Sequence, residues 1–219
     1  MARNVKIPLA ASLACAVGLG LLTLFALSIA AGRHVDVRLF LRFSEDEPSG
    51  GTLADAIASL GGPLPMIAML IAACVIALWR GRPRDALAAL LVVASANLTT
   101  QLLKLLLAHP KVKLAISGDP YEANTFPSGH TTGAASIVVA YAFVLPDRLR
   151  RLVLGLGAAF ALAVGCSTVA IGWHHPSDVL GAYLVVACWG FAVLAATRAI
   201  GPRRSRGVGV NPRTPLPSP

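Results

Sequence analysis

The feature that most constrains this chain is a series of long apolar runs. The first run covers residues 8–31 and contains no charged side chain. About 20 apolar residues in a helix cross the roughly 30 Å hydrocarbon core of a bilayer. This run is longer than the apolar part of a signal peptide, which has about 7–15 residues. We therefore interpret it as a membrane-spanning helix.

Five further apolar runs follow, at residues 64–79, 86–103, 131–145, 152–173 and 179–200. The run at 64–79 is expected to start earlier, near Leu53, with an internal kink at Gly61-Gly62-Pro63. Only 13% of the residues are charged and 56% are hydrophobic, whereas a soluble domain has about 25% charged residues. This composition excludes a soluble globular domain, a disordered chain and a disulfide-stapled secreted module. We predict an all-α polytopic membrane protein, a bundle of six transmembrane helices over residues 1–200.

Lysine and arginine are distributed unevenly between the two sides that these spans define. Six spans place both termini on the same side of the membrane. Thirteen of the 19 Lys and Arg residues fall on that side, in the two terminal segments and in the turns at 80–84 and 148–151. Short loops rich in Lys and Arg remain in the cytoplasm. We therefore expect both termini to be cytoplasmic, in a protein of the cell membrane.

The formal net charge of +9 follows mainly from this topology, together with affinity for anionic lipid headgroups. Nucleic-acid binding is the alternative explanation for the Arg-rich residues 201–219. That segment has no interleaved aromatic residues and no recognisable module, so we expect no nucleic-acid partner. Its Pro- and Gly-rich composition predicts a disordered cytoplasmic tail. Residues 34–43 alternate apolar and polar side chains, which leaves a strand and an interfacial helix on the outer leaflet both possible.

Polar residues gather where the third and fourth runs approach the outer face. Lys104 closes the third run, and alone it could simply extend its ammonium group to the membrane interface. The loop that follows adds two more cations, Lys111 and Lys113, with His109 nearby. The fourth run then begins directly after the tetrapeptide at residues 127–130.

That tetrapeptide, Pro-Ser-Gly-His, has the composition of an anion-binding helix start. Ser128 is predicted to cap the helix, and the free N–H groups and positive dipole of a helix N-terminus attract anions. Gly129 allows an anion to approach the backbone closely. His130 lies in the first turn, where it could donate a proton to a bound group. A simple cap beside an interfacial histidine would explain Ser128 but not the other two residues.

A second polar segment joins the fifth and sixth runs on the same face. His174 and Asp178 are four residues apart, a spacing at which the carboxylate can hold one imidazole nitrogen and leave the other basic. His130, His174, His175 and Asp178 also have the chemistry of metal ligands, so a metal site is the alternative. Because lysines and a helix N-terminus favour an anion over a cation, we expect a phosphate group, with no metal and no cofactor.

Together these residues resemble the signatures of the type 2 phosphatidic acid phosphatase superfamily, the membrane lipid phosphate phosphatases. The second signature of that family, Pro-Ser-Gly-His, is identical to residues 127–130. The third, Ser-Arg-x5-His-x3-Asp, is matched by Ser167, His174 and Asp178, with Thr168 in the arginine position. The resemblance implies the six-helix bundle of the membrane members of the family.

The first signature of the family, Lys-x6-Arg-Pro, aligns on Lys104. Its arginine position holds Lys111 and its proline position holds Val112. Lysine keeps the charge of arginine but loses the planar, bidentate guanidinium. Lys113 or His109 could supply charge in compensation.

The resemblance also implies a role for each matched residue. His174 would be the nucleophile that forms a phosphohistidine, Asp178 would orient it, and His130 would protonate the leaving oxygen. The phosphoryl oxygens would be held by Lys104, Lys111, Ser128 and Gly129, with accessory roles for Lys113, Ser167, Thr168 and His175. The substrate implied is a lipid-linked phosphate at the outer face of the membrane.

The two missing arginines keep an alternative open. A relative that has lost its chemistry could bind or carry a lipid phosphate without hydrolysing it. Loss of one donor to a transition state costs about 10²–10³-fold in rate. We favour the enzyme, because a binding protein leaves the joint presence of His130, His174 and Asp178 unexplained.

Overall fold

The computed structural model describes residues 4–44, 53–107 and 125–200, and all its regular elements in these ranges are helices. The confirmed fold class is thus all-α. In chain order the helices are α1 (Lys6–Thr23), the π-helix η1 (Leu24–Ser28), α2 (Ala30–Phe43), α3 (Leu53–Ser59), α4 (Pro63–Trp79), α5 (Pro83–Leu106), α7 (Gly129–Val144), α8 (Asp147–Ala170) and α9 (Pro176–Ile200). The predicted tail at 201–219 lies outside the described residues.

Among the described residues, four helical stretches are long and apolar enough to cross a membrane: α1 with η1, α5, α8 and α9. Helices α3 and α4 form a fifth candidate as a pair bent by 48°, and the bend falls at the predicted Gly61-Gly62-Pro63 kink. The remaining predicted span, the fourth in chain order, corresponds to α7, which has 16 residues. A helix of this length covers only about 24 Å. Length and composition therefore support a multi-pass membrane protein without establishing the count of six.

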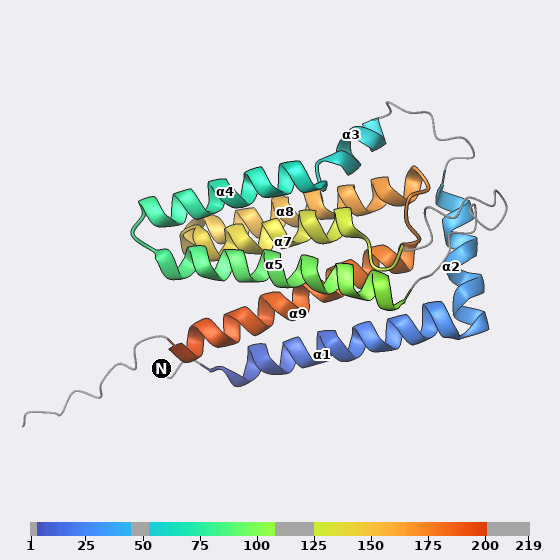
Figure 1. Cartoon of the computed structure of the whole chain (residues 1–219), viewed down its shortest axis with the longest axis horizontal. Coiled ribbons are helices and arrows are strands. Elements are labelled where there is room, and N and C mark those ends of the chain that lie inside the picture. Colours follow the sequence, from blue (N-terminus) through green and yellow to red (C-terminus); the bar gives the residue numbers. More distant parts are fainter. Residues whose placement is uncertain (1–3, 45–52, 108–124, 201–219) are drawn as a thin grey trace, which may run out of the picture.

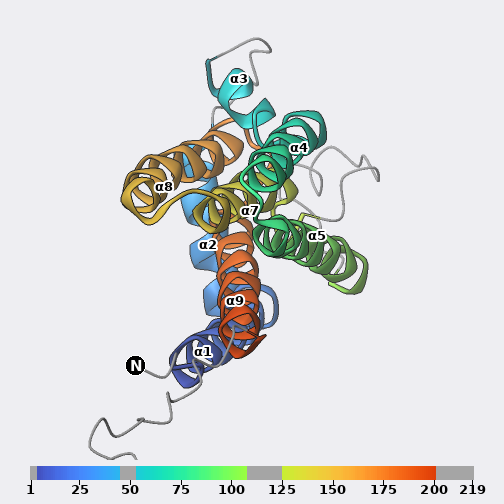
Figure 2. The ribbon, with the colours of Figure 1, turned by 90° about the vertical axis from the view of Figure 1, so that its left-hand side faces the viewer.

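Helix α7 lies at the centre of the bundle. It packs against α4, α5, α8 and α9, whereas α1 packs mainly on the outer side of α9 (Figure 2). The buried side chains are mostly small, such as Ala73, Ala89 and Ala140 in one core cluster. Large apolar side chains instead point outward, including Leu98 and Leu156, which are 62% and 65% exposed. Small residues inside and leucine outside are the pattern of helices that pack closely within lipid.

The first predicted span ends earlier than expected, because the chain turns sharply at Ile29. Ile29 has an extended backbone, and the Arg33 guanidinium donates to the carbonyls of Leu27 and Ser28 that the end of η1 leaves free. Gly32 has no side chain to collide with the Phe25 carbonyl, so α2 can fold back on η1. Residues 34–43, for which the sequence left a strand and a helix both possible, are therefore helical. They belong to α2, which crosses one end of the bundle (Figure 1).

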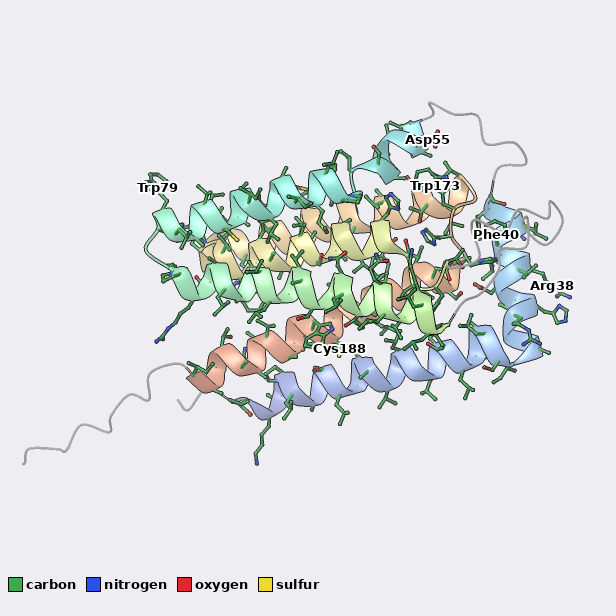
Figure 3. All side chains as sticks on the ribbon, in the orientation of Figure 1. Arg38, Phe40, Asp55, Trp79, Trp173 and Cys188 are labelled. Carbon is green, nitrogen blue, oxygen red and sulfur yellow. The ribbon has the colours of Figure 1, made fainter. Side chains whose placement is uncertain are left out.

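The two ends of the bundle carry different side chains. Phe40 and Trp173 lie at the end that α2 covers, and Trp79 lies at the opposite end (Figure 3). Trp79 is 87% exposed, as expected for a tryptophan at a membrane–water interface. Near it lie the predicted cytoplasmic turns, after α4 and after α7. The end covered by α2 contains the start of α7 and the loop between α8 and α9, which hold the predicted site.

Candidate active site

The start of α7 has the capped geometry that the tetrapeptide predicts. The Ser128 side chain accepts a hydrogen bond from the Thr131 N–H at 3.3 Å, and the Ser128 carbonyl accepts from the Thr132 hydroxyl at 2.7 Å. Both threonines and Ser128 are fully buried. Helix α7 therefore begins with a rigid first turn, whose positive dipole end lies at the site.

Gly129 leaves a space between this first turn and Lys104. A methyl group placed on Gly129 would lie 3.7 Å from the Lys104 ammonium nitrogen. Lys104 comes from the last turn of α5, so two helices place a cation and a helix N-terminus side by side. The structure thus brings together two positively polarised groups that the sequence predicted to act together, an arrangement that suits an anion.

The loop between α8 and α9 holds His174 close to Asp178. The Nδ1 atom of His174 lies 3.3 Å from Oδ2 of Asp178. Because a carboxylate can only accept hydrogen bonds, this contact places the proton on Nδ1 and the lone pair on Nε2. His174 is 7% exposed and Asp178 is fully buried. A buried carboxylate thereby orients the imidazole as a nucleophile or a base requires.

The backbone of this loop is fixed by α8. The Thr168 carbonyl accepts hydrogen bonds from the N–H groups of Trp173 and His174, at 2.9 and 3.1 Å. Gly172 reverses the chain with a φ of 73°, which glycine adopts without steric cost. His174 therefore leaves the end of α8 in a defined direction.

Asp178 also ties the loop to the first turn of α9. Its Oδ2 atom accepts from the backbone N–H of His175 at 2.9 Å and lies 3.8 Å from the Nδ1 atom of that residue. An acidic side chain in the first turn that reaches back to the N–H just before the helix forms half of a capping box. The same carboxylate thus stabilises the start of α9 and orients His174.

The two motif segments meet through a direct backbone contact. The Ser128 N–H donates to the Asp178 carbonyl at 3.0 Å. His130 lies within electrostatic range of both His174 and Lys104. The His130 ring also lies beside Trp173, with ring centroids 5.1 Å apart. A histidine pair, a carboxylate, a cation and a helix start consequently share one site.

The structure brings together most of the predicted residues. Within the described ranges these are Lys104, Ser128, Gly129, His130, His174, His175 and Asp178. Ser167 and Thr168 are buried in the last turns of α8, and the Thr168 hydroxyl donates to the Gly165 carbonyl at 2.8 Å. Thr168 supports the loop with its carbonyl. Lys111, Lys113 and His109 lie outside the described residues.

Sequence reasoning missed two other contributors to the site. The elbow between α3 and α4 presses against the start of α7, where any side chain at Gly61 would collide with the His130 carbonyl. Helix α2 contacts the first turn of α9 through Asp36 and the α8–α9 loop through Phe40. The sequence predicts a kink at this glycine pair but does not show its contact with α7. Spacing likewise gives no sign of the partner of Asp36, since both contacts join residues far apart in the chain.

Across residues 4–44, 53–107 and 125–200, no group of three or more His, Cys, Asp or Glu side chains has an arrangement that could hold a metal ion. The donors of the described site include the Lys104 ammonium and a helix N-terminus, which repel cations. The described residues thus match an anionic ligand better than a bound cation.

Fold and site together define a class, a helical membrane protein with a buried His–Asp pair beside the capped start of a central helix. The chain belongs to the PAP2 superfamily, whose family model matches residues 85–202. This range contains every predicted site residue, and the resemblance inferred from the three signatures is confirmed.

Two individual proteins are similar to this chain. Undecaprenyl-diphosphatase BcrC of Bacillus subtilis (strain 168) is 41% identical over 73 residues, which cover 33% of this chain and 35% of the relative. The match thus covers about a third of the length of that relative. The crystal structure of a transmembrane PAP2 type phosphatidylglycerolphosphate phosphatase from Bacillus subtilis superposes with a TM-score of 0.74. It covers 90% of this chain and 99% of its own, at 22% identity, and shows the shared fold.

Proposed function

We propose that this protein is a phosphatase that hydrolyses a lipid-linked phosphate through a phosphohistidine intermediate. The observation that carries the proposal is the His174–Asp178 contact at 3.3 Å, next to the Lys104 and Gly129 corner. Membership of the PAP2 superfamily supports it, as do the names of the two similar proteins, one an undecaprenyl-diphosphatase and the other a phosphatidylglycerolphosphate phosphatase.

In the first step the Nε2 lone pair of His174 attacks phosphorus. An N–P bond forms, the bond from phosphorus to the leaving oxygen breaks, and His130 gives that oxygen a proton. Asp178 stabilises the positive charge that develops on His174. Lys104, Lys111, Ser128 and the Gly129 N–H hold the other phosphoryl oxygens, since phosphoryl transfer is catalysed mainly by positioning and charge stabilisation.

In the second step a water molecule attacks the phosphohistidine. Its oxygen bonds to phosphorus, the N–P bond breaks, and His130, now neutral, accepts a proton from the water. Inorganic phosphate leaves and His174 is regenerated. We propose that the charge stabilisation comes from the protein cations and needs no metal ion.

We propose further that the site faces the outside of the cell membrane. The turns after α4 and after α7 lie at the bundle end opposite the site. Both turns are rich in arginine, and turns of this kind remain cytoplasmic. The apolar outer faces of the helices would hold the acyl or prenyl tail in the membrane while the headgroup reaches the site.

Purified protein tests the proposal directly. Phosphate release is measured with phosphatidic acid, phosphatidylglycerol phosphate, undecaprenyl diphosphate and a prenyl-phosphosugar phosphate, with His174→Ala as the inactive control. Radiolabelled substrate should leave an acid-labile, alkali-stable label on the wild-type chain only. No release from any of the four lipids, or equal release by His174→Ala, refutes the proposal.

One observation favours a second candidate, a protein that binds a lipid phosphate without turnover. Thr168 is fully buried and its hydroxyl is bonded to the Gly165 carbonyl, so the position supplies no cation. Under this alternative, lipid phosphates bind with unchanged headgroups in the assay above. Its further consequence is that arginine at positions 111 and 168 together should create activity.

A further inference from the structure

The first turn of α9 depends on a carboxylate from another helix. Pro176 opens α9 and has no N–H, so the Ser177 N–H is the first donor of the helix without an acceptor inside the helix. In most helices a side chain just before the first turn accepts from this donor. His175 occupies that place, and its ring instead packs against Phe40 of α2, with ring centroids 4.6 Å apart.

Asp36 of α2 supplies the missing acceptor. Its Oδ1 atom accepts from the Ser177 N–H at 3.0 Å, and its Oδ2 atom accepts from the Ser177 hydroxyl at 2.6 Å. The two residues are 141 positions apart in the chain. Asp36 is 7% exposed and Ser177 is 4% exposed, so water does not replace these bonds readily. Hydrogen bonds to a charged acceptor are the stronger kind.

The turn that Asp36 holds is the turn that carries Asp178. Ser177 and Asp178 are consecutive, and Asp178 holds both the His175 N–H and the His174 Nδ1. The His175 carbonyl accepts from the N–H groups of Asp178 and Val179, so the Ser177 N–H is the donor of this turn that depends on Asp36. Because Asp36 holds Ser177, the neighbouring Asp178 can keep its position against His174.

We propose that Asp36 is a positioning residue for hydrolysis, acting through Ser177 on the His174–Asp178 pair; this rests on the proposed function. Asp36 does not touch the reacting atoms. It fixes the first turn of α9, and Phe40 fixes the adjacent His175 ring from the same helix. Helix α2 is thus a part of the catalytic apparatus that holds the nucleophile in its attacking orientation.

The test compares Asp36→Ala and Asp36→Asn with the same two substitutions at Asp147. Asp147 is 89% exposed at the start of α8, at the opposite end of the bundle. For each protein, kcat and KM are measured on the best lipid substrate of the panel. Hydrogen–deuterium exchange of the Ser177 and His175 amides is measured in parallel, with fragmentation that resolves single residues.

Asp36→Ala should lower kcat about 10- to 100-fold, since small misplacement of reacting groups costs that much, and should change KM by less than about threefold. Exchange should accelerate at Ser177, which loses its own acceptor, and also at His175, which is held by Asp178. Asp36→Asn keeps one acceptor and should show smaller changes in the same direction. If Asp36→Ala does not fold, kcat, KM and amide exchange are measured on Asp36→Asn instead. The Asp147 variants should match the wild type in all readouts.

The exchange rate of the His175 amide shows whether Asp36 positions Asp178 or only bonds to Ser177. In an active enzyme, an unchanged kcat or an unchanged His175 exchange rate in the Asp36 variants overturns the proposal. If the wild type releases no phosphate, the proposed function fails, and the exchange rates alone then decide whether Asp36 fixes Asp178. Exchange that accelerates at Ser177 but not at His175 would show that it does not.

Discussion

The two ends of the bundle hold their polar groups in opposite ways. At the site end, four polar residues from α2, the α8–α9 loop and α9 are less than 10% exposed and are hydrogen-bonded to one another in pairs: Asp36 with Ser177, and His174 with Asp178. At the other end, charges form short-range pairs within single helices. Arg150 and Asp147 are 2.9 Å apart with side chains 42% and 89% exposed.

This difference predicts where substitutions will matter. A buried polar group that loses its partner costs about 1–3 kcal/mol, and more if it is charged. An exposed ion pair contributes only about 0–1 kcal/mol. Substitutions of polar groups at the site end are therefore expected to change stability and geometry, whereas those at the opposite end should change little.

The largest expected effect is at His174. His174→Gln should lower phosphate release by about 10⁴-fold or more, as removal of a nucleophile does elsewhere. The matched variant is His175→Gln, which replaces a second buried histidine beside the same carboxylate. It should retain at least about tenfold more activity than His174→Gln. Equal losses in the two variants would contradict the assignment of His174 as nucleophile.

The second-largest effect is expected at Lys104, whose ammonium group lies beside the start of α7. Lys104→Gln should lower kcat/KM by about 10²–10³-fold, because it removes charge stabilisation from the transition state. Lys6→Gln is the control, since Lys6 is exposed at the start of α1. A Lys104 variant that falls by less than about fivefold would exclude a direct role for this ammonium group.

A smaller effect is expected when the space at Gly129 is filled. Gly129→Ala places a methyl group 3.7 Å from the Lys104 ammonium nitrogen, an ordinary contact that the fold tolerates. The methyl occupies room that a phosphate oxygen needs, so KM should rise about tenfold. Gly155→Ala is the control, since a methyl group there meets nothing within 4 Å. An unchanged KM would place the phosphate elsewhere.

The same comparison explains how much of the site could be predicted from sequence. The Ser128 cap and the His174–Asp178 pair depend on residues at most four positions apart, so spacing alone predicts their contacts. The apolar runs also predict the helices, because a helix that crosses a bilayer needs about 20 apolar residues in a row. The kink at Gly61-Gly62-Pro63 likewise follows from local backbone chemistry.

Contacts between distant segments could not be predicted. Asp36 and Ser177 meet only after α2 folds across the end of the bundle, and neither residue has a local pattern that points to the other. The turn at Ile29 depends on Arg33 reaching back to two carbonyls, which hydropathy does not register. The contacts that support the site are thus tertiary, whereas the proposed reacting groups lie in short motifs that the sequence shows directly.

The smallest effect is expected at the opposite end of the bundle, at Asp147. Asp147→Asn removes the ion pair with Arg150, but Arg150 still donates to the Ala142 carbonyl at 2.8 Å. The loss is a solvent-exposed pair and a favourable charge in the first turn of α8, together under about 1 kcal/mol. Thermal unfolding in detergent should therefore shift by no more than a few degrees, and kcat/KM should stay at the wild-type value. A loss of activity without a loss of stability would mean that the two ends are coupled through α8, whose last turn carries the Thr168 carbonyl that holds His174.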